Sequence, residues 1–313
     1  MLLSPNELAI ARSVIYASLF DYPLTTDQLH ETLLESHQSV SEMLGAFASS
    51  DALQAIIEYR DGFFFPAGRE RIVVERRRRE ARSRAFLERH RRFLTVMCAL
   101  PYTRLVAVSG SLAHRNLERD GDLDLFIITR GRHVWSVTVA VVALAKLMRC
   151  RPVVCANFVI ADSRLSIEQQ DLFTANQIIH LRPLVGEPVF QEFLAANPFV
   201  GRFYPNYRGG AGPGGGELRR AARLDRVKAT VEALLSGPSR IVEAMCRHVY
   251  CWHLRRRAGL WRSPEQVRLD PDALKLHTRS HRQSTLERFD CAVREALHQV
   301  EAAEATTLAA IRR

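Results

Sequence analysis

Four apolar segments in the middle of the chain carry its clearest hydrophobic pattern. Residues 104–109, 125–129 and 153–160 are short apolar runs bounded by polar residues, which is typical of buried strands. Residues 134–145 form the most apolar segment, which is too short to cross a bilayer because a spanning helix needs about 20 residues. The pattern predicts two strands, then a buried helix, then a third strand.

The first 68 residues follow a helical pattern that ends in a hairpin. Capping boxes open three predicted helices, and they pair Ser4 with Glu7, Thr25 with Gln28, and Ser39 with Glu42. The turn dipeptide Asp61-Gly62 predicts a β-hairpin over residues 55–66. This order is that of a winged helix-turn-helix, which often reads DNA with its third helix.

The third of these helices argues against DNA binding. Residues 40–49 contain one Glu and no Lys or Arg, so the helix lacks the cations that attract phosphate and contact guanine. We therefore favour a winged helix that packs within the protein or contacts another protein.

Residues 69–92 carry most of the excess positive charge. Eleven arginines and four glutamates give this segment a net charge of +7, out of +10 for the whole chain. The segment is expected to be a helix that turns Phe86, Phe93 and Leu94 towards the next domain. Two interpretations remain open, a solvated connecting helix or an electrostatic funnel for a triphosphate or an RNA acceptor.

Composition places the chain among soluble, cytoplasmic proteins. Hydrophobic residues make up 47% and charged residues 25% of the sequence, as in ordinary globular proteins. The N-terminus lacks the features of a secretory signal, and six cysteines without Cys-x-x-Cys spacing indicate reduced thiols. The net charge of +10 favours an anionic partner.

The expected fold class is mixed α/β, with helices at both ends of the chain. Residues 209–216 are rich in glycine and predict a flexible linker. Helical spacing of apolar residues follows from 217 to the end. The predicted divisions are a winged helix (1–68), a basic connector (69–100), an α/β domain (101–208), the linker (209–216) and a helical domain (217–313).

A motif with chemical meaning joins the first two apolar runs. Gly110-Ser111 ends the first run, ten residues intervene, and Asp122-Leu-Asp124 opens the second. Because strand residues two apart point the same way, both carboxylates lie on one face, where they call for a divalent cation. A Gly-Ser turn before a short helical stretch suits phosphate. Together these features predict metal-assisted nucleotidyl transfer.

The motif resembles the signature of the DNA polymerase β-like nucleotidyltransferase superfamily, and the likeness covers about residues 100–206. The resemblance implies that Gly110 and Ser111 grip the phosphates of a nucleoside triphosphate, and that Asp122 and Asp124 hold Mg²⁺ or Mn²⁺. Family members often have an arginine after this loop, at the position that His114 occupies here. In this chain the basic residue is expected one position later, at Arg115. The implied reaction moves NMP to the hydroxyl of an acceptor, which is RNA, a protein or a small molecule.

The third carboxylate of catalytic members is the weak point of this resemblance. The strand expected to carry it, residues 152–160, has Asn157, which can ligate a metal but cannot accept a proton at neutral pH. Asp162 at the end of that strand is a second candidate. Strand alternation places it on the opposite face from Asn157, and an aspartate at a strand end is typical of a turn. Two functions therefore remain open, an active nucleotidyltransferase or a non-catalytic regulator that senses nucleotide or contacts nucleic acid.

Overall fold

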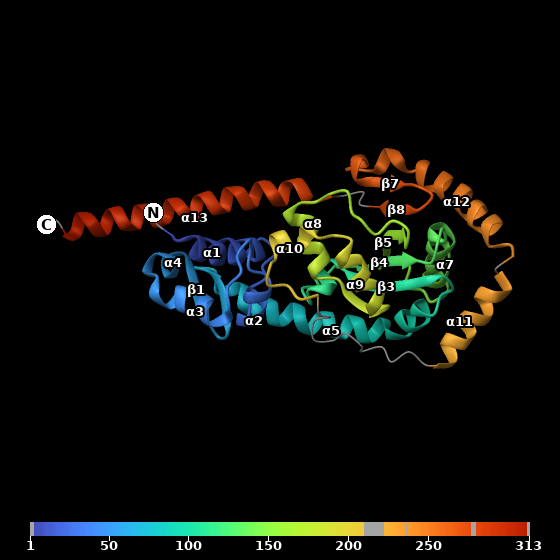
Figure 1. The fold of residues 1–313 in the computed structure, drawn as a ribbon, viewed down its shortest axis with the longest axis horizontal. Helices are drawn as coiled ribbons and strands as arrows, with labels where there is room; N and C mark the ends of the chain where they lie inside the picture. Colours follow the sequence, from blue (N-terminus) through green and yellow to red (C-terminus); the bar gives the residue numbers. More distant parts are fainter. Residues whose placement is uncertain (1–2, 210–221, 236, 277–279, 312–313) are drawn as a thin grey trace.

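The structure, a computed structural model, describes residues 3–209, 222–235, 237–276 and 280–311. Helices surround a central mixed sheet, and a smaller unit of helices with a hairpin lies at one end (Figure 1). The elements of this N-terminal unit are α1 (Pro5–Ser18), α2 (Thr26–Glu31), α3 (Val40–Ser49), α4 (Asp51–Ile56), β1 (Ile57–Arg60) and β2 (Phe63–Pro66).

Local hydrogen bonds explain where the first helices begin. Each predicted N-cap side chain accepts a bond from the backbone three residues later, and the Glu or Gln at that position accepts one from the N-cap backbone. The three predicted capping boxes are thus confirmed. In the hairpin, Asp61 and Gly62 both adopt positive φ, at 54° and 82°, as a two-residue turn requires. Helix α4, which the sequence pattern did not predict, begins where the Ser50 side chain accepts a bond from Leu53.

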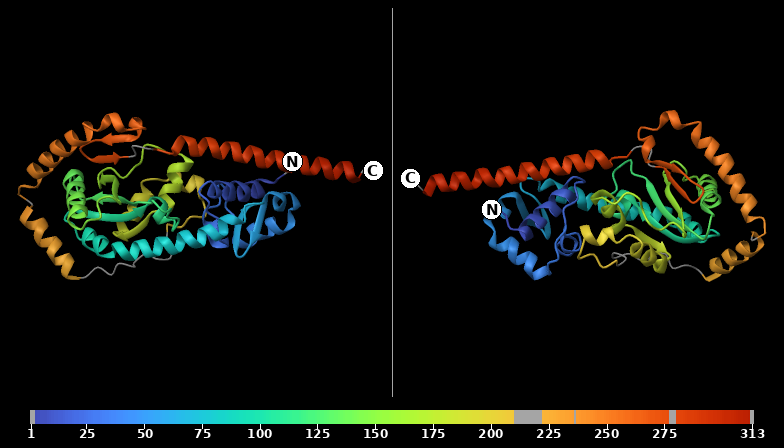
Figure 2. Two further views of the ribbon diagram at one scale, coloured as in Figure 1. Left: turned by 180° about the vertical axis from the view of Figure 1, so that it is seen from behind. Right: turned by 45° about the horizontal axis from the view of Figure 1, so that its top comes forward.

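A 28-residue helix, α5 (Arg71–Cys98), runs along the N-terminal unit and then along the central sheet (Figures 1 and 2). One of its arginines ties it to the N-terminal unit. Arg76 is buried, and it donates to the Pro23 carbonyl oxygen at 2.6 Å and to the Gln28 side chain at 3.1 Å. Its guanidinium carbon lies 3.8 Å from the centre of the Tyr22 ring, a cation–π contact. Part of the positive charge in residues 69–92, that of Arg76, is therefore buried inside the protein and used in its internal contacts.

Six strands, counted over the described residues, form the central sheet in the order β6-β3-β4-β5-β8-β7. Strands β4 and β5 are parallel, and the other neighbours are antiparallel. The three predicted strands are confirmed as β3, β4 and β5. The strands are β3 (Thr103–Ser109), β4 (Leu123–Thr129), β5 (Val154–Ala161), β6 (Arg182–Val185), β7 (Val267–Leu269) and β8 (Ala273–Leu276).

Helices cover both faces of this sheet, which is why β3 and β4 are continuously apolar. On one face, α5 and α7 (Val134–Leu147) pack against alternate strand residues such as Val106 and Leu125. On the other face, the intervening positions contact α8 (Leu172–Ile179) and α9 (Glu187–Ala195), and α10 (Phe199–Phe203) follows. The predicted buried helix between the second and third strands is confirmed as α7. Along the described chain, none of the helices combines the length and the apolar character that crossing a membrane requires.

The region after residue 217 is not wholly helical, which corrects the sequence-based expectation. Helices α11 (Ala222–Leu235) and α12 (Ser239–Arg255) lie at the end of the sheet remote from the N-terminal unit, and α13 (Arg282–Ile311) returns along that unit (Figure 2). Between α12 and α13, two 3-10 turns lead to the hairpin β7–β8, which pairs with β5. Strands of three and four residues are too short for an alternating pattern to stand out. Most of the predicted linker 209–216 lies outside the described residues.

We expect Arg76→Ala to destabilise the protein by about 2–4 kcal/mol, because it leaves the buried Pro23 carbonyl oxygen without its donor and removes the contacts with Gln28 and the Tyr22 ring. Arg77→Ala, at the exposed neighbouring position on the same helix, is the matched control and should change the free energy of unfolding by less than about 0.5 kcal/mol. Urea denaturation of both variants measures the difference. Equal effects would show that the Arg76 contacts do not hold the N-terminal unit on α5.

Candidate functional site

The predicted motif lies where the chain leaves β3 and where it enters β4. The antiparallel register pairs Ser109, the last residue of β3, with Asp124 near the start of β4. Gly110 and Ser111 open the one-turn helix α6 (Gly110–Ala113), which begins directly beside Asp124. The structure therefore brings together Gly110, Ser111, Asp122 and Asp124, which the sequence placed in one site.

Gly110 lies so close to the Asp124 carboxylate that an added side chain would force the carboxylate to move. A Cβ atom at Gly110 would lie 2.4 Å from the Asp124 Oδ2 atom, far inside van der Waals contact. The residue also adopts a φ of +64°, which side-chain-bearing residues rarely occupy. Two independent constraints thus require glycine at the point where backbone meets carboxylate.

The two carboxylates and a thiol form a compact polar group. Burial, with the Asp122 charge as a second cause, raises the pKa of Asp124 to about 6. Cys155, the partner of Asp124 in the parallel β4–β5 pair, donates from Sγ to Asp122 Oδ2 at 3.8 Å. Burial and the two aspartates raise the pKa of the Cys155 thiol to about 12, so it remains a neutral donor. This group disfavours further negative charge and suits a cation.

A cavity of about 240 Å³ opens beside Asp124 on the sheet face that α8 covers. Its walls include Phe126 and Phe158 from β4 and β5, and Lys275 from β8. Lys275 pairs with Phe158 across the strands and donates to the Gln169 side chain at 2.6 Å. Burial, with Arg282 and Arg268 as further causes, lowers the pKa of Lys275. Aromatic walls with a cation and a carboxylate pair suit a planar base that carries phosphate.

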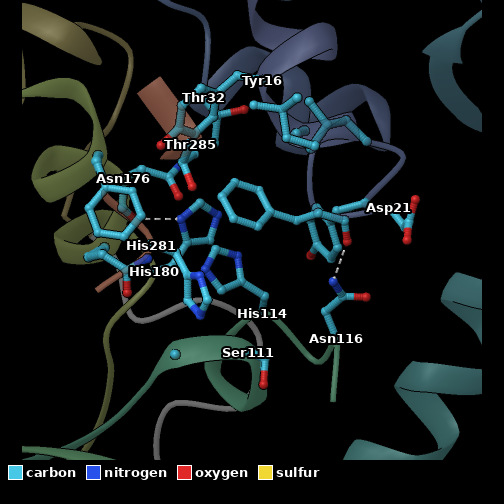
Figure 3. Close-up of a pocket in the computed structure, with 18 of the residues that line it drawn as sticks. Tyr16, Asp21, Thr32, Ser111, His114, Asn116, Asn176, His180, His281 and Thr285 are labelled. Carbon is cyan, nitrogen blue, oxygen red and sulfur yellow. Dashed lines mark hydrogen bonds between the residues drawn. The ribbon is translucent and has the colours of Figure 1, made fainter. Parts of the chain in front are cut away.

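A second cavity, of about 390 Å³, lies on the other side of Gly110, between α6 and the N-terminal unit. It shares Gly110, Phe173, Gln177 and His281 with the first cavity, so the two adjoin. Figure 3 shows the imidazoles of His114, His180 and His281 at its centre, with Ser111 at one end and Tyr16, Thr32 and Thr285 at the other. The Gly-Ser turn therefore faces two adjoining spaces of different character.

Two of these histidines are neutral at physiological pH. The rings of His114 and His180 stack with their centres 3.8 Å apart. Burial lowers the pKa of His180 to about 4 and that of His114 well below its ordinary value, with Arg76 and Arg182 adding to both effects. His180 Nδ1 lies 2.8 Å from the Asn176 carbonyl oxygen, which can only accept. Nδ1 therefore carries the proton, and Nε2 presents a lone pair.

Helix α5 fixes the loop that joins α6 to β4. The Ser83 hydroxyl accepts a bond from the Leu117 backbone N–H at 3.1 Å, and Arg82 donates to the Leu117 carbonyl oxygen at 2.7 Å. Asn116 donates to the Phe20 carbonyl oxygen of the N-terminal unit at 2.8 Å. The loop between Ser111 and Asp122 is thus held from both sides, and this fixes the spacing of the motif in space.

Two further predicted site residues, Arg115 and Asp162, form ion pairs of their own. Arg115 adopts a φ of +53°, which turns the chain after α6, and its guanidinium lies 3.6 Å from Glu80 in a further cavity beside α5. Asp162 follows the last residue of β5, at the end of the sheet opposite Asp124. There it pairs with Arg104 at 3.1 Å and accepts from the Gly131 backbone N–H. Asp162 is thus a turn residue in an ion pair.

Asn157 lies on β5, in the stretch where the register with β4 shifts between Asp124 and Phe126. Its side chain is outside the described part of the structure. Among the described residues, His, Cys, Asp and Glu nowhere gather in groups of three or more that could hold a metal ion. The donors that the described part of the site offers a cation are the Asp122 and Asp124 carboxylates.

Cys155, Lys275 and the stacked histidines were missed by the sequence reasoning. Cys155 could have been found by aligning the starts of the two parallel strands, which sets it opposite Asp124. Lys275 could not, because the hairpin that carries it was expected to be helical. His114 was noticed only as a family position, and nothing local in the sequence pairs it with His180.

The comparisons with known proteins identify no relative, since no family model, no curated protein and no solved structure matches this chain. The site must therefore be interpreted from its own geometry.

Gly110→Ala should cost about 2–4 kcal/mol of stability, since it adds a clash with Asp124 to the strain of positive φ. The matched control is Gly131→Ala at the other end of β4, where φ is +56° and no described atom lies within 4 Å of an added Cβ. There we expect about 1 kcal/mol, from strain alone. Chemical denaturation compares the two variants, and equal losses would contradict the Gly110–Asp124 contact.

Asp124→Asn should stabilise the metal-free protein at pH 7 by about 1–2 kcal/mol. The folded protein holds the Asp124 proton more tightly than the unfolded chain does. The free energy of unfolding of the parent protein therefore falls as the pH rises from the ordinary aspartate value of 3.8 to about 6. Thermal unfolding in EDTA at pH 4 and pH 7 tests this, because the variant's advantage should vanish at pH 4. A variant that is less stable at pH 7 would show that other contacts hold the ionised carboxylate.

Proposed function

We propose that this protein is a metal-dependent nucleotidyltransferase that moves NMP from a nucleoside triphosphate to an acceptor hydroxyl. The observation that carries the proposal is the contact of Gly110 with Asp124, beside Asp122 and at the mouth of an aromatic cavity. It places a backbone that can approach phosphate against a carboxylate pair that favours a cation.

The residues present fit a divalent cation at the carboxylates. Asp122 and Asp124 supply hard oxygen ligands, and the raised pKa of Asp124 means that a bound cation would remove a repulsion that the metal-free protein carries. Mg²⁺ or Mn²⁺ there would neutralise the phosphate charge that builds up during transfer. Gly110 and Ser111 would position the phosphates, and Lys275 would face them from β8. The base of the nucleotide would lie between Phe126 and Phe158.

We also propose that the N-terminal unit is a winged helix that serves packing. The helix order and the hairpin support this proposal, and the bridge between Leu24 and Phe64 adds a short third strand to the hairpin. The third helix, α3, carries no cation, so DNA is not the favoured partner. Contacts with α5 and with the loop after α6 instead make this unit one wall of the site.

The alternative is a non-catalytic regulator that binds nucleotide, and the residue at position 157 favours it. The strand expected to carry a third carboxylate, β5, has Asn157 in its place in the sequence, and Asp162 lies at the end of the sheet opposite Asp124. Such a protein would keep metal-dependent nucleotide binding and lack transfer.

The deciding experiment follows label from a panel of α-labelled nucleoside triphosphates, with Mg²⁺ or Mn²⁺, into host cell extract. We expect transfer by the parent protein and at least a hundredfold loss in Asp124→Asn, because one metal ligand is gone. Asp120→Asn, an exposed aspartate in the same loop, is the matched control and should retain transfer.

Calorimetry of the same proteins with Mg²⁺ and each triphosphate completes this test. Binding without transfer, with activity created by Asn157→Asp, would establish the regulator. Nucleotide binding that survives unchanged in Asp124→Asn would contradict both functions.

A further inference from the structure

We propose that the 390 Å³ cavity beside Ser111 binds the acceptor, and that the acceptor is a small, uncharged molecule with several hydroxyl groups on a ring. This inference rests on the proposed nucleotidyl transfer. The cavity lies between α1, α6, α8 and α13, and it adjoins the Asp124 cavity at Gly110. An acceptor held there would present a hydroxyl to the phosphates that Gly110 and Ser111 position.

Buried polar atoms without a partner show that the cavity is built to bind a polar ligand. Within the described part of the chain, the Tyr16 hydroxyl and the Asn116 Oδ1 atom have no hydrogen-bond partner. Both residues line the cavity and are buried, with exposed fractions of 3% and 6%. An unsatisfied buried polar atom is costly, and a protein interior normally provides it with a partner. A ligand hydroxyl can accept a hydrogen bond from the Tyr16 hydroxyl or donate one to Asn116 Oδ1. A ligand with several hydroxyl groups can therefore satisfy both atoms.

The carboxylates around the cavity are paired with arginines, and the remaining charged lining residue, Arg288, is exposed and lies 3.5 Å from the Leu19 carbonyl oxygen, so the centre of the cavity favours an uncharged ligand. Asp21 pairs with Arg69 at 2.7 Å and with Arg79 at 3.3 Å, and Glu118 lies 3.8 Å from Arg79. His114 and His180 are neutral at pH 7 because both are buried. A phosphorylated or strongly cationic acceptor would find no free counter-charge at the centre of this space.

The shape and the walls of the cavity favour a ring. Aromatic side chains line it on several sides, and 390 Å³ is the size of a small-molecule site. The faces of a sugar, a cyclitol or the ribose of a nucleoside pack well on aromatic rings while their hydroxyls bond at the edge. The aromatic residues are Tyr16, Phe20, Tyr22, Phe173 and Tyr204.

The stacked histidines complete the reaction that this placement allows. The acceptor oxygen forms a bond to the α-phosphorus as the bond between that phosphorus and the pyrophosphate oxygen breaks. The acceptor hydroxyl donates to the lone pair on His180 Nε2, whose other ring nitrogen is held by the Asn176 carbonyl oxygen, and this bond orients the oxygen. Pyrophosphate leaves from the adjoining cavity, and the hydroxyl proton is lost to water.

The test uses ligand-observed NMR on the full chain, with Mg²⁺ and the four α,β-methylene nucleoside triphosphates present. One panel contains neutral sugars and cyclitols, and a second contains nucleosides. We expect binders in one panel, and at least a fivefold loss of affinity in Tyr16→Phe. That variant removes only the unpaired hydroxyl, so it should fold as stably as the parent. Tyr59→Phe, at an exposed tyrosine of β1, is the matched control and should bind as the parent does.

The outcomes distinguish a failure of the acceptor-site inference from a failure of the proposed nucleotidyl transfer. Binders from one panel with the Tyr16 dependence support the inference, and the panel identifies the source of the ring. No binder, binding unaffected by Tyr16→Phe, or binding of an RNA oligonucleotide alone overturns it. Ring binding without any Mg²⁺-dependent triphosphate binding would leave the cavity as a ligand site and remove the nucleotidyl transfer. Asp124-dependent triphosphate binding without ring binding would support the nucleotide site and overturn the acceptor site.

Discussion

The site depends on one close approach, that of the Gly110 backbone to the Asp124 carboxylate. The register of β3 and β4 sets the two residues opposite one another, and a positive φ at Gly110 turns the chain into α6 immediately afterwards. Any side chain at Gly110 would displace the carboxylate, and any slip of register by one residue would turn Asp124 into the apolar core. The position of Ser111 at the start of α6 and the meeting of the two cavities at Gly110 follow from this contact.

The arginines of α5 explain how the contact is kept in place. The sequence left open whether this charge run is a solvated helix or a funnel for an anion, and the described contacts give part of it a third role. Arg76 and Arg79 bind the N-terminal unit, and Arg82 with Ser83 holds the loop that leads to Asp122. Of the eleven arginines in residues 69–92, all but Arg76, Arg79 and Arg82 are exposed, so the hypothesis of an electrostatic funnel now concerns eight positive charges.

The sequence could predict those elements whose signals lie in neighbouring residues, and it could not predict contacts between distant segments. Capping boxes, the Asp61-Gly62 turn and continuously apolar strands are local signals, and the elements they predicted are present. The pairing of Cys155 with Asp124 depends on a strand register that shifts one step later, and β8 brings Lys275 to the site across more than a hundred residues. Arg115 was expected near phosphate from its place in the motif, and the structure adds a positive φ at this residue and an ion pair with Glu80. Contacts between distant segments and backbone turns of this kind leave no pattern in a single sequence.

Gly110 also divides the site by electrostatic character. On one side lie two carboxylates and Lys275, and on the other lie imidazoles that burial keeps neutral. A triphosphate with its cation needs the first environment, because its charge must be matched. A hydroxyl group suits the second, since a neutral imidazole can accept a hydrogen bond from it whereas an imidazolium cannot. The N-terminal unit contributes to this difference, because α1 lines the second cavity and the Arg76 charge lowers the pKa of both His114 and His180.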